Sequence, residues 1–74
     1  MSYNIYLVED EQNLNDILTF YLEKENWNVT SFFNGTDAQS MINNPPHLWV
    51  LDIMLPDIDG IQLLKEIKEK TPDV

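Results

Sequence analysis

Residues 48–60 read LWVLDIMLPDIDG, an apolar run that carries one carboxylate, Asp52, and is followed by turn-forming residues that include Pro56 and Gly60. A short apolar run bounded by turn residues is typical of a strand buried on both faces, as in a parallel sheet. Asp52 then lies at or near the carboxyl end of that strand, where open α/β sheets place their ligands. The stretch therefore predicts a parallel sheet with an acidic group at its ligand-binding edge.

Two further strands and three helices are predicted along the chain. The predicted strands are residues 4–8, 29–33 and 48–53, and the predicted helices are residues 13–26, 36–43 and 60–70. Strands and helices that alternate with short connections imply a parallel sheet with right-handed crossovers. The predicted fold class is therefore α/β, with three parallel strands in the order 2-1-3 of a doubly wound sheet.

Apolar residues at helical spacing predict which side of each helix faces the sheet. The expected inner residues are Leu14, Ile17, Leu18, Tyr21 and Leu22 in the first helix, Ala38, Met41 and Ile42 in the second, and Ile61, Leu64 and Ile67 in the third. Asn13 and Thr36 are the expected N-caps of the first two helices, because their side-chain oxygens can accept a hydrogen bond from the first turn. Pro45 and Pro46 end the second helix, since neither has an N–H to donate.

The composition limits the kind of protein this can be. The 74 residues carry four lysines, no arginine and thirteen acids, which gives a formal charge of −9. Binding to a phosphate backbone needs a basic face, so we expect no nucleic-acid binding by this segment; a metal cation or a basic protein surface suits the charge better. The hydrophobic share of 43% predicts a folded chain and not a disordered acidic tail. Because no stretch is typical of a signal peptide or a membrane span, we expect no membrane partner and a cytoplasmic location.

Acidic residues follow both the first and the third predicted strands. In the order 2-1-3 these strands are neighbours, so Glu9 and Asp10 are expected to meet Asp52. Three carboxylates in one place repel each other unless a cation binds them or one acid is protonated. Oxygen ligands favour Mg²⁺, and a divalent ion would let Asp52 attack a phosphoryl group and form an aspartyl phosphate. The residues thus predict a Mg²⁺ site beside a candidate nucleophile.

The chain resembles the receiver domain of two-component response regulators in two places. The first is LVEDE at residues 7–11, and the second is LDIMLPDIDG at residues 51–60, where Pro and Gly follow the acceptor Asp at the family spacing. The Met-Leu-Pro sequence at residues 54–56 is most similar to the subgroup with a winged-helix output domain, and the whole chain is similar to secretion-stress regulators of Gram-positive bacteria. The resemblance implies a flavodoxin-like fold, of which this chain would form a partial (βα)3 sheet.

The resemblance also implies roles for individual residues. It makes Asp52 the phosphoacceptor, has Glu9 and Asp10 hold Mg²⁺ together with Asp52, and makes Met54 a metal ligand through its backbone carbonyl. It implies a sensor histidine kinase as phosphodonor and a DNA-binding transcriptional regulator as the full-length protein, and it does not imply an enzyme. Residues 1–74 match only the first three strands and helices of the family pattern, so we expect them to be the N-terminal portion of a receiver domain.

Two alternatives stay open. The strand at residues 48–53 would be an exposed apolar edge, a template for pairing with a second copy. The chain is alternatively an interaction module that binds a kinase or dimerises, without phosphoryl transfer. The weaker alternative is a small acidic binder of Mg²⁺ or Ca²⁺ with no phosphoryl chemistry. Asp57, Asp59 and Gly60 imitate part of a calcium-binding EF-hand loop, but the flanking segment reads as a strand, which excludes that loop.

Overall fold

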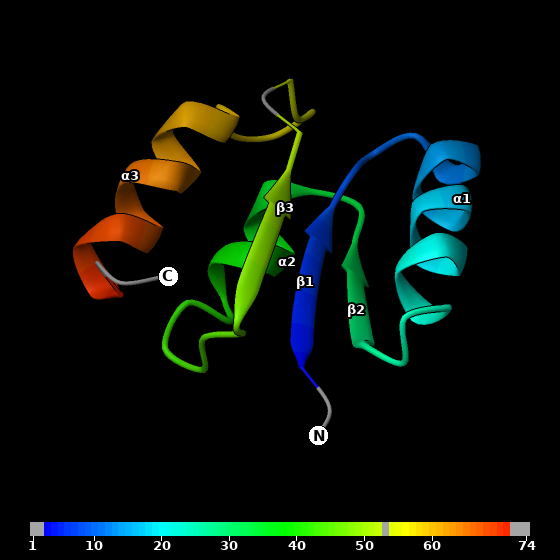
Figure 1. Ribbon diagram of the computed structural model, residues 1–74. Coiled ribbons are helices and arrows are strands. Elements are labelled where there is room, and N and C mark those ends of the chain that lie inside the picture. Colours follow the sequence, from blue (N-terminus) through cyan, green and yellow to red (C-terminus); the bar gives the residue numbers. More distant parts are fainter. Residues whose placement is uncertain (1–2, 53, 72–74) are drawn as a thin grey trace.

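The computed structural model describes residues 3–52 and 54–71, in which three parallel strands form one sheet covered by helices (Figure 1). The elements are β1 (Asn4–Val8), α1 (Gln12–Glu23), β2 (Asn28–Phe32), α2 (Gly35–Gln39), β3 (Leu48–Leu51) and α3 (Gly60–Lys70). The strand order is β2-β1-β3, and both pairings are parallel. The predicted α/β class and the order 2-1-3 are confirmed. The predicted end of the third strand at Ile53 lies outside the described residues.

β1 is the central strand, and it supplies most of the core. All of its residues from Ile5 to Val8 are buried, because helices lie on both faces of the sheet. Tyr6 and Val8 point to the face that carries α2 and α3, where they pack with Phe32, Leu63 and other apolar side chains. The other face is the one on which α1 lies, since the Thr19 hydroxyl of α1 is 2.9 Å from the Ser31 hydroxyl of β2. The two-sided burial predicted for the third strand is thus found in the first.

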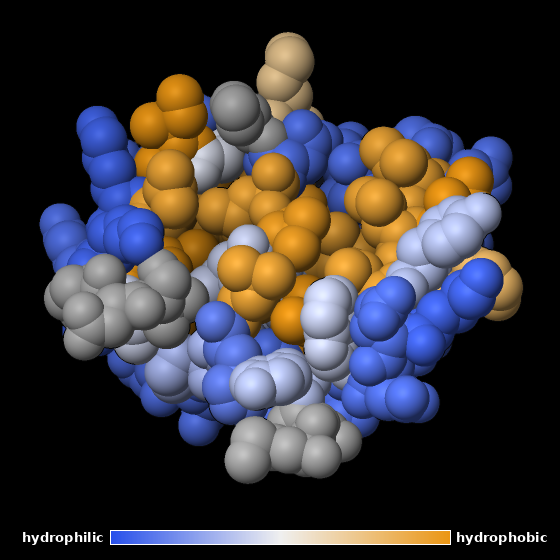
Figure 2. All heavy atoms as spheres, in the orientation of Figure 1, coloured by the Kyte–Doolittle hydropathy of each residue, from blue (hydrophilic) through white to orange (hydrophobic). Residues whose placement is uncertain are grey.

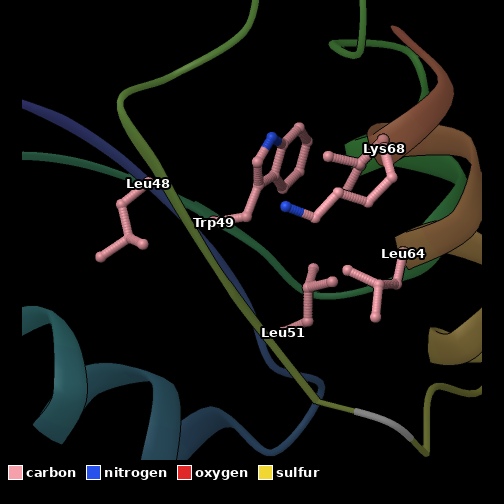
Figure 3. Close-up of a pocket in the computed structure, with 6 residues that line it drawn as sticks. Leu48, Trp49, Leu51, Leu64 and Lys68 are labelled. Atoms are coloured by element: carbon pink, nitrogen blue, oxygen red, sulfur yellow. The ribbon is translucent and has the colours of Figure 1, made fainter. Parts of the chain in front are cut away.

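β3 forms the edge of the sheet beside α3. Its residues Trp49 to Leu51 are half-buried and Leu48 is exposed. The Trp49 ring meets the Tyr6 ring edge to face, with 5.0 Å between centroids, so the half-buried Trp49 packs against the core. Figure 3 shows that Trp49 and Leu51 point toward α3 whereas Leu48 points the other way, as expected for the alternation along a strand.

The inner face of α3 differs from the predicted one. Leu63 and Ile67 are buried, whereas Ile61 is 48% and Leu64 is 43% exposed. The bounds of the helix and the inner position of Ile67 are confirmed. The prediction failed at the other two positions because leucines stand at both 63 and 64, so helical spacing fits two overlapping faces.

The inner face of α1 also differs from the predicted one. Leu14, Ile17 and Tyr21 are exposed, and the fully buried residue of this helix is the polar Asn15. The N-cap is Glu11, whose carboxylate accepts hydrogen bonds from two N–H groups of the first turn, so the predicted cap at Asn13 was wrong. Figure 2 shows an apolar surface that extends from the strands at the centre of the molecule toward α1. None of the helices within residues 3–52 and 54–71 is long and apolar enough to cross a membrane.

α2 is shorter than predicted and begins one residue earlier. Its N-cap is Asn34, whose side chain accepts a hydrogen bond from Asp37, and not Thr36. The helix ends at Gln39, after which turns carry the chain to Asn44. The predicted inner residues Ala38 and Ile42 are buried nonetheless, because the turns keep them on the side of the sheet.

Candidate metal and phosphoacceptor site

The backbone of the sheet brings three acids together at the carboxyl ends of β1 and β3, the upper edge in Figure 1. The Asp52 N–H donates to the Val8 carbonyl at 2.9 Å, and the Glu9 N–H donates to the Phe32 carbonyl at 3.0 Å. The hydrogen bonding of the sheet thus continues to the acids themselves. One carboxylate oxygen each from Glu9, Asp10 and Asp52 lies within 4.8 Å of the others. The predicted convergence of these three residues is confirmed.

The three carboxylates differ in exposure. Glu9 is buried, with 8% of its surface exposed, Asp52 is half-buried, and Asp10 is exposed. Burial raises the pKa of Glu9 above its ordinary 4.5, and the negative charges of Asp52 and Asp10 raise it further. A hydrogen bond of 3.0 Å from the Glu11 N–H to Oε2 acts in the opposite direction. The ionised carboxylates at this edge therefore repel one another, and a bound cation would offset that repulsion.

The residues of this site fit a hard divalent cation. Their side-chain donors are all oxygens, and one carboxylate lies deep while another reaches solvent, which leaves room for coordinating waters. Met54 lies next to the cluster, since its N–H donates to Asp52 Oδ1 at 3.1 Å. The Met54 backbone therefore lies within hydrogen-bonding distance of the Asp52 carboxylate. The role of the Met54 carbonyl as a ligand stays a prediction.

Asn15 is a residue of this site that the sequence patterns missed. Its amide Nδ2 donates to the Glu9 carbonyl at 3.0 Å and to the Phe32 carbonyl at 3.4 Å, and its Oδ1 accepts from the Thr19 hydroxyl at 3.2 Å. The side chain thereby ties α1 to the ends of β1 and β2 directly behind the acids. The sequence did hold a signal that Asn15 is buried. Leu18 and Leu22 follow it by three and seven residues, which places all three side chains on one face of the helix.

Glu9→Gln is expected to raise the melting temperature of the metal-free chain at neutral pH. The amide keeps an oxygen to accept from Glu11 but carries no charge to bury beside Asp52. Because the pKa of Glu9 is raised by folding, protonation of wild-type Glu9 stabilises the fold as the pH falls through that raised pKa toward 4.5. The difference in melting temperature between Glu9→Gln and wild type should therefore become smaller over that pH range.

Circular dichroism melts in a chelating buffer at several pH values measure this effect. Glu23→Gln, at the exposed end of α1, is the control with the same change in charge, and should leave the melting temperature close to that of wild type. A lower melting temperature for Glu9→Gln at neutral pH would contradict the expected charge repulsion at the cluster.

A parallel sheet in the order 2-1-3 with an acidic cluster at its carboxyl edge is the arrangement of response-regulator receivers, and the family comparison agrees. The family model described as response regulator receiver domain matches residues 5–74. The chain belongs to the response-regulator receiver family.

Among curated proteins, the chain is 66% identical over 74 residues to the transcriptional regulatory protein CssR of Bacillus subtilis, which covers 100% of this chain and 33% of that protein. It is 44% identical to the regulatory protein VanRc of Enterococcus gallinarum, over 93% of this chain and 30% of that protein. The response regulator SaeR of Staphylococcus aureus is 37% identical over 96% of this chain and 31% of its own length. The chain thus spans about a third of the length of these relatives.

Solved receiver structures match the fold closely. A CheY-like receiver protein from Methanospirillum hungatei superposes with a TM-score of 0.92 at 27% identity, over 97% of this chain and 58% of that chain. The response regulator TrrA from Thermotoga maritima, solved in complex with Mg(2+)-BeF, gives a TM-score of 0.88 at 30% identity, over 96% of this chain and 63% of that chain. The fold is therefore a partial flavodoxin-like receiver fold.

Proposed function

We propose that this chain is a phosphoacceptor segment, in which Asp52 receives a phosphoryl group in a Mg²⁺-dependent step. The observation that carries the proposal is the cluster of Glu9, Asp10 and Asp52, whose oxygens lie within 4.8 Å of one another at the end of the central sheet. The TrrA structure with Mg(2+)-BeF is a relative with a matching fold, and it supports the choice of ion. Glu9, Asp10 and Asp52 would hold Mg²⁺, with the carbonyl of Met54 as a further ligand.

The proposed step is a displacement at phosphorus. One oxygen of the Asp52 carboxylate attacks the phosphorus of a phosphohistidine, the P–N bond breaks, and the histidine nitrogen leaves with the bonding pair and takes up a proton. Mg²⁺, when bound, neutralises charge on the carboxylates and on the phosphoryl oxygens. The Met54 N–H holds Oδ1 of Asp52 and so orients the carboxylate for attack. The residue is modified once per molecule, so the segment acts as a substrate of the kinase and not as an enzyme.

The proposed partners are supported by the family and by the names of the relatives. A sensor histidine kinase is the proposed donor, and a transcriptional regulator that binds DNA through a separate domain is the proposed full-length protein, because CssR is named a transcriptional regulatory protein. The charge of −9 supports the view that this segment itself does not bind nucleic acid. A regulator of this kind works beside the chromosome, so we propose a cytoplasmic location.

Incubation with Mg²⁺ and acetyl phosphate, followed by intact mass, tests the proposed function. We expect one added phosphoryl group on the wild-type chain, which disappears in Asp52→Asn and when Mg²⁺ is removed by a chelator. Asp16→Asn is the control, because this exposed acid of α1 lies outside the cluster and an asparagine can still accept from Gln12. No added mass on the wild-type chain, or the same added mass on Asp52→Asn, would refute the function.

A second candidate function, self-association, is favoured by one observation, the open edge of β3. In the order β2-β1-β3 the outer side of β3 has no neighbouring strand among the described residues. A hollow of about 190 Å³ lies along it, lined by Trp49, Leu51, Leu64 and other residues of β3 and α3 (Figure 3). An unpaired apolar edge is a template for an identical edge, so we propose that the chain pairs with a second copy through β3.

Leu48→Lys is expected to shift the chain from dimer toward monomer in sedimentation velocity. Leu48 is 47% exposed on the edge strand, and a lysine there is a known device against edge pairing. Leu14→Lys is the matched control, since Leu14 is 41% exposed but lies on α1. A wild-type chain that stays a folded monomer at high concentration would rule out this second function.

A further inference from the structure

The loop between β3 and α3 is fastened to the start of α2 by one carboxylate. Asp57 Oδ1 accepts from the Gly35 N–H at 2.7 Å and from the Ile58 N–H at 3.0 Å. Asp57 Oδ2 accepts from the Thr36 N–H at 2.7 Å and also from the Thr36 hydroxyl. Both oxygens are thus occupied by donors, and three of these four donors belong to α2.

The same loop is closed at its other end. Asp59 caps α3 by accepting from the Ile61 N–H at 3.0 Å, and it pairs with Met54 in an isolated antiparallel bridge. Met54 in turn donates its N–H to Asp52 Oδ1. The bridge between Met54 and Asp59, together with the hydrogen bond at each of its ends, therefore links the Asp52 carboxylate to the start of α3.

Close packing between Gly35 of α2 and Ile58 of the loop is independent evidence that the loop is fixed against α2. A Cβ atom built on Gly35 would lie 2.2 Å from Cγ1 and 2.7 Å from Cδ1 of Ile58. The Ile58 side chain of the loop therefore packs directly on Gly35, and any larger residue at position 35 would force that side chain to move. The donors to Asp57, the Thr36 hydroxyl first among them, hold the pKa of its carboxyl at about 2, so that it is ionised at neutral pH.

We propose that Asp57 is a positioning residue for phosphoryl transfer, which holds the loop against α2 so that Met54 stays over the Asp52 carboxylate. This inference rests on the proposed function of Asp52. It goes further, because it assigns a role in the site to a residue whose carboxylate does not belong to the acidic cluster. The carboxylate acts through the loop and has no contact with the reacting oxygen.

The first test needs no metal. Hydrogen exchange at the Met54 amide, measured by NMR in a chelating buffer, is expected to be faster in Asp57→Asn and in Thr36→Val than in wild type. Thr36→Ser keeps the hydroxyl and is expected to restore slow exchange, and Asp16→Asn is the matched control for a lost carboxylate on the surface. The amide of Asn15, whose N–H donates to the Glu11 carbonyl in α1 on the other face of the sheet, reports any general loss of stability. Equal exchange at Met54 in Asp57→Asn and wild type would overturn the proposal.

The second test measures the site itself. Titration calorimetry with Mg²⁺ is expected to show a dissociation constant raised about tenfold in Asp57→Asn, the scale usual for residues that orient metal ligands, and unchanged in Asp16→Asn. Phosphorylation of Asp57→Asn by acetyl phosphate should slow with it. If the wild type binds Mg²⁺ and Asp57→Asn binds it equally well, the positioning role fails while the proposed function stands. If the wild type binds no Mg²⁺ and gains no phosphoryl group, the proposed function fails. The role of Asp57 in phosphoryl transfer then fails with it, even if Asp57→Asn speeds hydrogen exchange at Met54.

Discussion

Leu63→Ala is expected to leave most of the chain unfolded. The Leu63 side chain is fully buried among residues of β1, β2 and α2, and removing a buried leucine costs about 2–5 kcal/mol of the free energy of unfolding. A single core in a chain this small rarely supplies more than about 3–5 kcal/mol in total. Far-UV circular dichroism with a urea titration measures the loss.

Leu64→Ala is the matched control, because it makes the same chemical change one residue further along α3. Leu64 is 43% exposed, so its truncation is expected to cost far less than that of Leu63. Equal losses in both variants, or a larger loss at Leu64, would mean that α3 presents the face expected from helical spacing and not the one described above.

Asn15→Leu is expected to destabilise the chain by about 1–3 kcal/mol, although leucine is nearly the same size and more apolar. The amide of Asn15 is 1% exposed and satisfies the carbonyl of Glu9 deep behind the acidic cluster, and a leucine leaves that carbonyl without its partner. For a domain of this size, each 1 kcal/mol lowers the melting temperature by about 4–8 °C. A thermal melt in a chelating buffer records the change free of any effect of bound metal.

Asn13→Leu provides the comparison, because Asn13 is exposed and the cap of α1 is Glu11. Its melting temperature is expected to stay near that of wild type. A loss at Asn13 as large as that at Asn15 would indicate that Asn13 caps the helix in solution and that the buried amide contributes little.

The sheet and the site could be predicted from the sequence because both depend on local signals that agree. The apolar runs that end at Val8 and Leu51 each lead directly into acids, and a parallel sheet of order 2-1-3 places those two ends side by side. The cluster of Glu9, Asp10 and Asp52 then follows from strand order alone. No side-chain detail was needed.

The inner faces of α1 and α3 could be predicted only in part, whereas Ala38 and Ile42 are buried as predicted. An apolar stripe reports which residues favour burial, but it does not report whether another element covers them. Leu14 and Ile17 follow the expected spacing and are nevertheless exposed, because the face of α1 that packs on the sheet is the one that carries Asn15. The polar contacts of Asn15 and Asp57 depend on residues far away in the chain, which spacing within one helix or loop does not reveal.

The hydrogen bond between the Glu11 N–H and Oε2 of Glu9 has a consequence for the proposed metal site. The same Glu11 caps α1 with its own carboxylate, so the buried acid of the cluster and the first turn of that helix are joined through one residue. A cation that draws on Oε2 of Glu9 would compete with this N–H for the oxygen. If an ion binds the cluster as proposed, its occupancy is therefore expected to change the environment of the Glu11 amide at the start of α1.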